Sequence, residues 1–77
     1  MAVSAFIFIE CAQGKPLAVC RAVSRVEGIK MASAVTGPYD VVALGEAADI
    51  NALGRLVVGK IQKIQGVLRP TTSVCIE

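Results

Sequence analysis

The segment VSAFIFIEC at residues 3–11 decides the fold class of this 77-residue chain. Its apolar side chains occupy consecutive positions, and most of its residue types favour β-strands. A short, continuous apolar run of this kind is typical of a strand that is covered on both faces. We therefore expect a central β-strand with other elements, or other chains, packed on each side.

The residues that follow predict a helix and then a hairpin. Pro16 suits the first turn of a helix, where its missing N–H would have no partner anyway. Apolar residues at helical spacing continue this helix, and Gly28 ends it. Residues 29–35 and 39–45 are typical of two strands, with Thr36-Gly37-Pro38 supplying the turn between them.

A second helix and a last strand complete the chain. Asp49 is a candidate N-cap of this helix, Gly66 ends it, and residues 67–76 form the strand. Gly54 and Gly59 lie within the helix, where glycine lowers stability, so we expect something to pack closely against them. The apolar stripe predicted to face the core comprises Ile50, Leu53, Val57, Ile61 and Ile64.

A weak internal repeat favours one arrangement of these elements. A shift of 38 positions places Gly28 on Gly66 and Val23 on Ile61, although coincidence among abundant Val and Ile residues is the alternative. Two interleaved βαβ units give an α+β, ferredoxin-like βαββαβ fold. We expect residues 1–77 to form a single domain, with a four-stranded antiparallel sheet and both helices on one face.

The second face of that sheet also requires a cover. The first strand carries Phe6 and Phe8 on the side opposite Ile7 and Ile9, and the third strand is likewise apolar on both sides. Soluble monomers rarely leave an apolar face of this size exposed to solvent. A two-fold dimer with sheet against sheet is the simplest cover. The alternative is a poorly soluble monomer with generic hydrophobic strands.

Composition excludes several classes of partner. The net charge of +2 comes from cations interleaved with carboxylates, and the chain has only two Phe and one Tyr, so we expect no direct nucleic-acid partner. The longest apolar run, residues 5–9, is far too short to span a membrane. The N-terminus lacks the charged region of a signal peptide. We expect a soluble, cytoplasmic protein.

Metal and catalytic chemistry have little support. The three cysteines, Cys11, Cys20 and Cys75, are odd in number and scattered, and the chain contains no His. Neither a disulfide framework nor a usual zinc site is predicted. The six carboxylates are dispersed, and no glycine-rich phosphate loop is present. We expect no enzyme, no catalytic residue, no metal site and no cofactor.

Two polar segments remain as binding candidates. In residues 36–40 the turn offers backbone N–H groups, and Asp40 offers an anion suited to a ligand ammonium. The alternative is a simple turn in which Asp40 pairs with a nearby cation. In residues 69–73, three hydroxyls lie on both faces of a strand and are able to donate to a carboxylate, although threonine favours strands in any case.

The sequence resembles the effector-binding domain of the Lrp/AsnC, or feast/famine, transcription regulators over nearly its whole length. The hairpin at residues 36–42 matches the family's Gly-x-Tyr-Asp pattern, residues 65–67 match its helix terminator, and Thr72 lies in the closing strand. The resemblance implies an αβ-sandwich dimer that assembles into rings of dimers, with amino-acid effectors bound where dimers meet. The residues that it places near the ligand are Gly37, Tyr39, Asp40, Thr71, Thr72 and Ser73.

The chain begins immediately before its first strand, so we expect no helix-turn-helix domain and no direct DNA regulation. Our first hypothesis is an amino-acid sensor or modulator that forms homo-oligomers. The second is a pure assembly module that joins mixed oligomers with a full-length regulator. The third, an αβ-barrel enzyme resembling small dimeric monooxygenases, has the least support because those enzymes often rely on His or other polar residues in a cavity.

Overall fold

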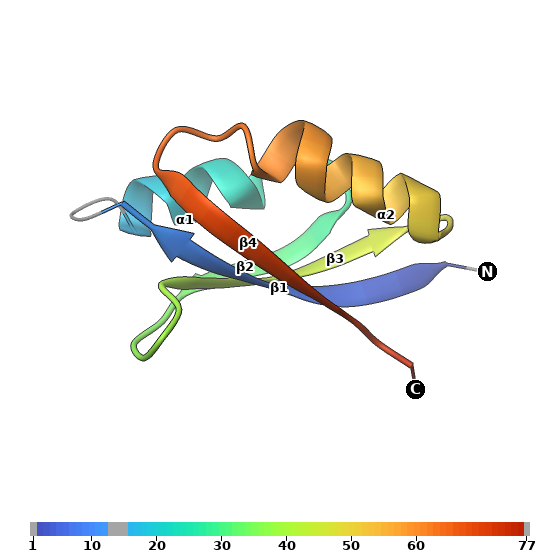
Figure 1. The fold of residues 1–77 in the computed structure, drawn as a ribbon, viewed down its shortest axis with the longest axis horizontal. Coiled ribbons are helices and arrows are strands. Elements are labelled where there is room, and N and C mark those ends of the chain that lie inside the picture. Colours follow the sequence, from blue (N-terminus) through green and yellow to red (C-terminus); the bar gives the residue numbers. More distant parts are fainter. Residues whose placement is uncertain (1, 13–15, 77) are drawn as a thin grey trace.

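The computed structural model describes residues 2–12 and 16–76 (Figure 1). The described chain alternates strands with helices, and its second helix continues into a π-helical segment labelled η1. The elements are β1 (Val3–Cys11), α1 (Pro16–Ser24), β2 (Ile29–Ala34), β3 (Val41–Ala47), α2 (Ile50–Leu56), η1 (Val57–Ile61) and β4 (Val67–Val74).

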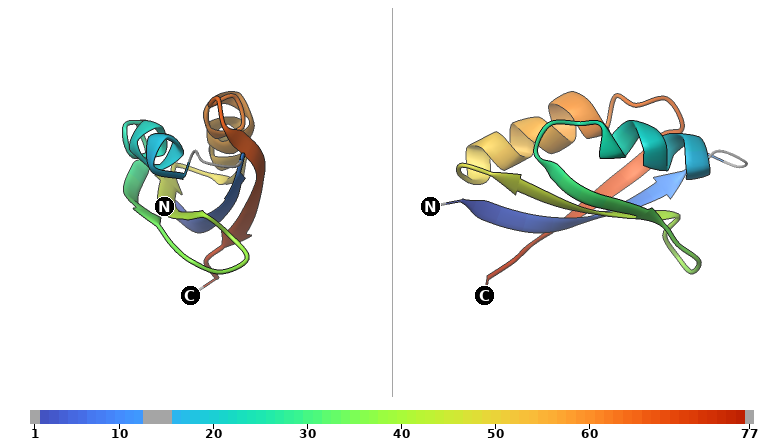
Figure 2. Two further views of the ribbon diagram at one scale, coloured as in Figure 1. Left: turned by 90° about the vertical axis from the view of Figure 1, so that its left-hand side faces the viewer. Right: turned by 180° about the vertical axis from the view of Figure 1, so that it is seen from behind.

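The four strands form one antiparallel sheet in the order β2-β3-β1-β4. Strands β1 and β3 are central, as their apolar sequences predicted. Both helices lie on the same face of the twisted sheet, and the opposite face is bare (Figures 1 and 2). The ferredoxin-like fold expected from the sequence is therefore confirmed.

The hydrophobic core lies between the helices and one face of the sheet, which we call the covered face. Alternate residues of β1 and β3 point into it, including Ile7, Ile9 and Val41, which have no exposed surface. They pack with Val19 and Val23 of α1 in the larger of two clusters. Burying such side chains contributes about 1.5–3 kcal/mol each, so these residues carry much of the stability.

The other side of the sheet, which we call the open face, is also largely apolar. Its members alternate with the core residues along each strand, and cross-strand register places them side by side. Phe6 lies opposite Leu44 and Phe8 opposite Val42, while Met31 lies beside Leu44 on the far side. Phe6 is 41% exposed and Met31 45% exposed, so the described chain leaves this apolar surface in contact with solvent.

Two helix boundaries differ from the sequence-based expectation. Helix α1 ends at Ser24, four residues before Gly28, because the N–H groups of Arg25 and Val26 bond three residues back and tighten the chain into a turn. Gly28 still ends the turn, with a φ of 100° that favours glycine. The second helix likewise gives way to turns after Ile61 before Gly66, whose φ is also 100°.

Helix α2 begins as predicted but faces the core differently. The Asp49 side chain accepts a hydrogen bond from the Ala52 N–H at 2.7 Å, which confirms the N-cap. The prediction that Ile50 belongs to the core is wrong, since its side chain is 57% exposed. Ile50 borders a groove along β4 that the described chain does not cover, and Leu56, absent from the predicted stripe, is buried instead.

Candidate functional site

The hairpin between β2 and β3 carries half of the predicted site residues. Thr36, Gly37 and Pro38 form its exposed tip. Gly37 has a φ of 115°, a left-handed conformation that L side chains rarely adopt, so glycine is required here by the turn itself. Gly37 therefore has a structural reason to be glycine whether or not a ligand approaches it.

Asp40 connects the base of the hairpin to β1 through hydrogen bonds. Its carboxylate Oδ2 accepts a hydrogen bond from the Cys11 N–H at 2.8 Å, and its own N–H donates to the Ile9 carbonyl at 2.9 Å. Its carbonyl accepts from the Val35 N–H at 2.8 Å. From the sequence we expected either a ligand ammonium or a cation opposite this carboxylate; in the described residues the carboxylate holds two strand ends together.

The Asp40 carboxylate also borders an open depression of about 590 Å³ beside the hairpin. Pro16 of α1 lines its other side, and Val35 and Thr36 complete it. Among the hydrogen bonds of the described residues, only one carboxylate oxygen accepts from Cys11, so the other keeps its capacity to accept.

Tyr39 turns toward the open face rather than toward the depression. Its ring lies against Phe8 with centroids 5.2 Å apart and an interplanar angle of 41°. Tilted aromatic pairs of this kind contribute about 0.5–1.5 kcal/mol beyond the area that they bury. Cross-strand register places Thr71 of β4 on one side of Phe8 and Val42 of β3 on the other. Tyr39 thus marks one end of the apolar open face.

The three hydroxyls of β4 divide between the two faces of the sheet, as alternation along a strand requires. Thr71 lies opposite Phe8 and Ser73 opposite Phe6, so both belong to the open face. Thr72 lies opposite the buried Ile7 and borders the groove between α2 and β4. The structure therefore brings Tyr39 and Thr71 together around Phe8 but separates Thr72 from them.

Phe8 is the site residue that sequence reasoning missed. Its place in a continuous apolar run suggested only a buried strand, yet it is half-buried and forms the floor between Tyr39 and Thr71. The signal available in the sequence was the alternation of side chains along β1. The helices cover only its odd-numbered positions, so Phe8 lies on the open face. The sequence alone did not show that the Tyr39 ring returns across the hairpin to meet Phe8.

Charged residues flank the apolar centre of the open face. At one end, Lys30 Nζ lies 3.8 Å from Glu46 Oε1, and at the other, Glu10 lies opposite Arg69 across β1 and β4. Both side chains of the Lys30 pair are well exposed, so this ion pair adds at most about 1 kcal/mol to stability. Charges at the rim and apolar side chains in the centre are the usual anatomy of a protein interface.

The cysteines of the described chain are free thiols. Burial raises the pKa of the Cys11 thiol above its ordinary value of 9.0, and the neighbouring Asp40 and Cys20 add to the rise. A raised pKa keeps this thiol protonated and weakly nucleophilic near neutral pH. Within residues 2–12 and 16–76, no group of three or more Cys, Asp or Glu side chains is arranged to hold a metal ion.

None of the helices in the described part of the chain is both long enough and apolar enough to cross a membrane.

Comparison with known proteins identifies similar domains. The family model of the Lrp/AsnC ligand binding domain matches residues 4–77. Among solved structures, a protein of Thermus thermophilus is 29% identical with a TM-score of 0.91, and the match covers 97% of this chain and 94% of that chain. No significantly similar protein is found among curated proteins.

Two more distant structures share the fold. AsnC of E. coli is 21% identical with a TM-score of 0.90, and the match covers 97% of this chain and 51% of AsnC. A transcriptional regulator of Neisseria meningitidis in complex with L-methionine is 21% identical with a TM-score of 0.84, and the match covers 97% of this chain and 50% of the regulator. This chain thus spans about half the length of both regulators.

Proposed function

Because the chain belongs to the Lrp/AsnC ligand-binding domain family, we propose that it is an oligomeric sensor or modulator that binds a small amino-acid effector. The observation that carries this proposal is the open face, where an apolar surface ends in the cluster of Tyr39, Phe8 and Thr71. A hydrophobic floor with a few polar groups at its edge is the usual composition of a small-molecule site.

A second copy of this chain is the proposed cover of the open face. Phe6, Met31 and Leu44 form a continuous apolar surface across three strands, and a chain of 77 residues buries too little surface to be comfortably stable alone. Two-fold packing of sheet on sheet removes this surface from water and produces an αβ sandwich. We propose that such dimers assemble further into a ring.

Six residues are proposed to contact the effector, and they comprise Gly37, Tyr39, Asp40, Thr71, Thr72 and Ser73. The Asp40 carboxylate suits the ligand ammonium, and the β4 hydroxyls suit its carboxylate. Within one copy, Thr71 and Thr72 point to opposite faces, which supports the proposal that a ligand in contact with both lies between copies. The bound L-methionine of the Neisseria meningitidis regulator supports an amino acid as the class of effector.

The second candidate function is assembly with a full-length regulator and no small ligand. The observation in its favour is that this chain covers about half of AsnC of E. coli, so the same sheet face is available for pairing with the corresponding domain of a longer protein. Either role is proposed to be non-enzymatic and cytoplasmic, in keeping with three free cysteines and a family of regulatory ligand-binding domains.

Light scattering of the purified chain, with and without each common amino acid, tests the proposal. We expect a mass above that of the dimer, which is twice 8.0 kDa, and a change in that mass with one amino acid or a few related ones. An oligomer that responds to none of them but co-purifies with a regulator favours the assembly module. A monomer under all conditions contradicts both candidates.

A matched pair of variants places the ligand. Thr71→Val keeps the shape of the side chain and removes the hydroxyl, so the amino-acid response is expected to require about tenfold more ligand while the ligand-free mass stays the same. Ser24→Ala removes a hydroxyl at the end of α1, away from the open face, and serves as the control. An unchanged response in Thr71→Val argues against this hydroxyl as a contact.

A further inference from the structure

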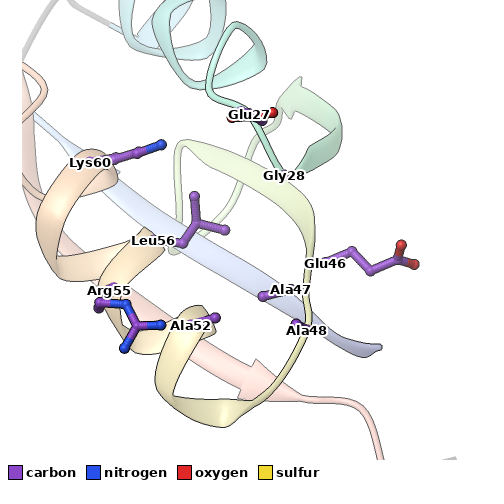
Figure 3. Close-up of a pocket in the computed structure, with 9 residues that line it drawn as sticks. All are labelled: Glu27, Gly28, Glu46, Ala47, Ala48, Ala52, Arg55, Leu56 and Lys60. Atoms are coloured by element: carbon purple, nitrogen blue, oxygen red, sulfur yellow. The ribbon is translucent and has the colours of Figure 1, made fainter. Parts of the chain in front are cut away.

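A separate cleft lies at the other end of β3 from the hairpin (Figure 3). It has a volume of about 560 Å³ and opens between α2, η1 and the chain that follows β3. Leu56, Ala47 and Ala52 provide its apolar lining. This volume is within the range of about 300–1,000 Å³ that is usual for small-molecule sites. None of the residues proposed above for the effector lines this cleft.

The charged residues of the cleft are separated by sign. The cations Arg55 and Lys60 come from α2 and η1, on one wall. The carboxylates come from the other wall, Glu27 from the turn between α1 and β2 and Glu46 from β3. In Figure 3 the Lys60 side chain extends across the cleft in the direction of Glu27, while Arg55 lies beside Ala52.

These charges differ in how far they are already engaged. Glu46 extends away from the cleft in Figure 3 and pairs with Lys30 at 3.8 Å. In the part of the chain that the structure describes, no ion pair within 4.0 Å involves Glu27, Arg55 or Lys60. Two cations on one wall and one carboxylate on the other therefore face an apolar floor without partners from the described residues.

The turn that carries Glu27 is held close to the opposite wall by Gly28. Gly28 has a φ of 100°, and a Cβ at this position would lie 3.1 Å from the Glu46 carbonyl oxygen and 3.4 Å from a Leu56 methyl group. Glycine thus allows the backbone to approach both residues closely. The acidic wall is fixed by backbone packing rather than by a flexible loop.

We infer that this cleft is a second binding site, which takes a small zwitterion such as an α-amino acid with a short side chain. The ligand carboxylate lies between Arg55 and Lys60, and its ammonium lies at Glu27. A simple anion would have Glu27 opposite it, and a simple cation would have Lys60 opposite it. A dipolar molecule matches both walls, and its short side chain covers Leu56 and the alanines.

Amide chemical shifts of the full chain, recorded during titration with glycine and alanine, test the inference. We expect saturable shifts at Gly28, Ala48 and Ala52. Acetate and methylammonium, which carry one charge each, are expected to cause much smaller shifts at the same concentrations. Equal responses to glycine and to either single-charge probe would overturn the assignment to a zwitterion.

Two substitutions and a control identify the residues. Lys60→Gln and Glu27→Gln are each expected to raise the Kd of glycine by about three- to tenfold, because each removes one charge-assisted hydrogen bond that is partly screened by solvent. Lys63→Gln removes an exposed cation just beyond η1 and outside the cleft lining, and is expected to leave the Kd unchanged. Equal effects of all three substitutions would indicate that the Kd of glycine depends only on the overall charge of the chain, and would overturn the inference.

The outcome is separable from that of the proposed effector site. Shifts confined to the hairpin and the open face, with none at Gly28, Ala48 and Ala52, overturn the second site and leave the proposed function intact. Shifts confined to the cleft, with no change in oligomer mass, support the second site and contradict the proposed function.

Discussion

Asp40 has a structural role at the base of the hairpin, in addition to the ligand contact proposed for it. Its carboxylate satisfies the Cys11 N–H, where β1 ends, and its backbone continues the pairing of the hairpin with Ile9 and Val35. Tyr39 precedes Asp40 in the sequence, and its ring lies against Phe8. Asp40 therefore fixes the backbone beside Tyr39, at the aromatic end of the open face.

Removal of this carboxylate is expected to destabilise the fold. Asp40→Ala leaves the Cys11 N–H without its partner, and we expect a loss of about 1–3 kcal/mol in the free energy of unfolding, measured by urea denaturation. Asp40→Asn keeps an oxygen acceptor and is expected to lose less. Thr36→Ala, at the exposed hairpin tip, is the control.

The Asn variant also separates the two roles of Asp40. If Asp40→Asn keeps most of the stability but loses the amino-acid response, the negative charge acts on the ligand. If Asp40→Ala unfolds at the same urea concentration as the unmodified chain, the hydrogen bond to Cys11 contributes nothing and the positioning role is contradicted.

At the scale of elements, α2 contains a glycine, which lowers its intrinsic helix stability. Gly54 lies in its interior with a negative φ, and a Cβ there would meet nothing within 4 Å. The described residues do not provide the close packing at Gly54 that was expected from the sequence. Nothing in the described structure explains why a glycine occupies this position, which borders the groove between α2 and β4.

Gly54→Ala is expected to stabilise the isolated chain by about 0.5–1 kcal/mol, since alanine is the better helix former. For a domain of this size the corresponding rise in Tm is about 2–8 °C, measured by thermal denaturation. Gly28→Ala is the opposing control and is expected to destabilise, because its φ of 100° and the nearby Glu46 carbonyl both disfavour a side chain. A loss of stability in Gly54→Ala would instead indicate that another copy packs against α2.

At the scale of the whole molecule, the two faces of the sheet differ in what covers them within the described chain. The covered face is closed by the chain's own helices, whereas the open face ends in solvent with Phe6 and Met31 more than a third exposed. Removal of apolar side chains from water is favourable at either face. Association through the open face would therefore remove exposed apolar surface from water and lower the free energy.

Leu44→Lys places a charge near the middle of the open face and is expected to shift the chain from an oligomer to a monomer of 8.0 kDa, measured by light scattering. Leu44 lies between Phe6 and Met31, so the lysine would be buried without a partner if a second copy covered it. Leu17→Lys, at a side chain of α1 that is 62% exposed, is the control and is expected to leave the mass unchanged. An oligomer that survives Leu44→Lys would exclude the open face as its interface.

The sequence by itself determined the order of the elements and the residues at which several of them begin, although β3 was expected at residues 39–45 and lies at Val41–Ala47. Strand β1 occupies Val3–Cys11 as predicted, and Asp49 caps α2, because strand runs and caps depend on residues that are neighbours along the chain. The apolar residues at both parities of β1 and β3 likewise predicted that both sheet faces are apolar, since side chains alternate with a period of two.

Only the tertiary structure decided which side chains meet. The contact of Tyr39 with Phe8, the hydrogen bond from the Cys11 N–H to Asp40 and the opposite orientations of Thr71 and Thr72 all join segments far apart in the sequence, or depend on the register of β4. The exposure of Ile50 was likewise set by the position of α2 beside β4. Periodicity along one element specifies a face, but what that face touches depends on how the whole chain packs.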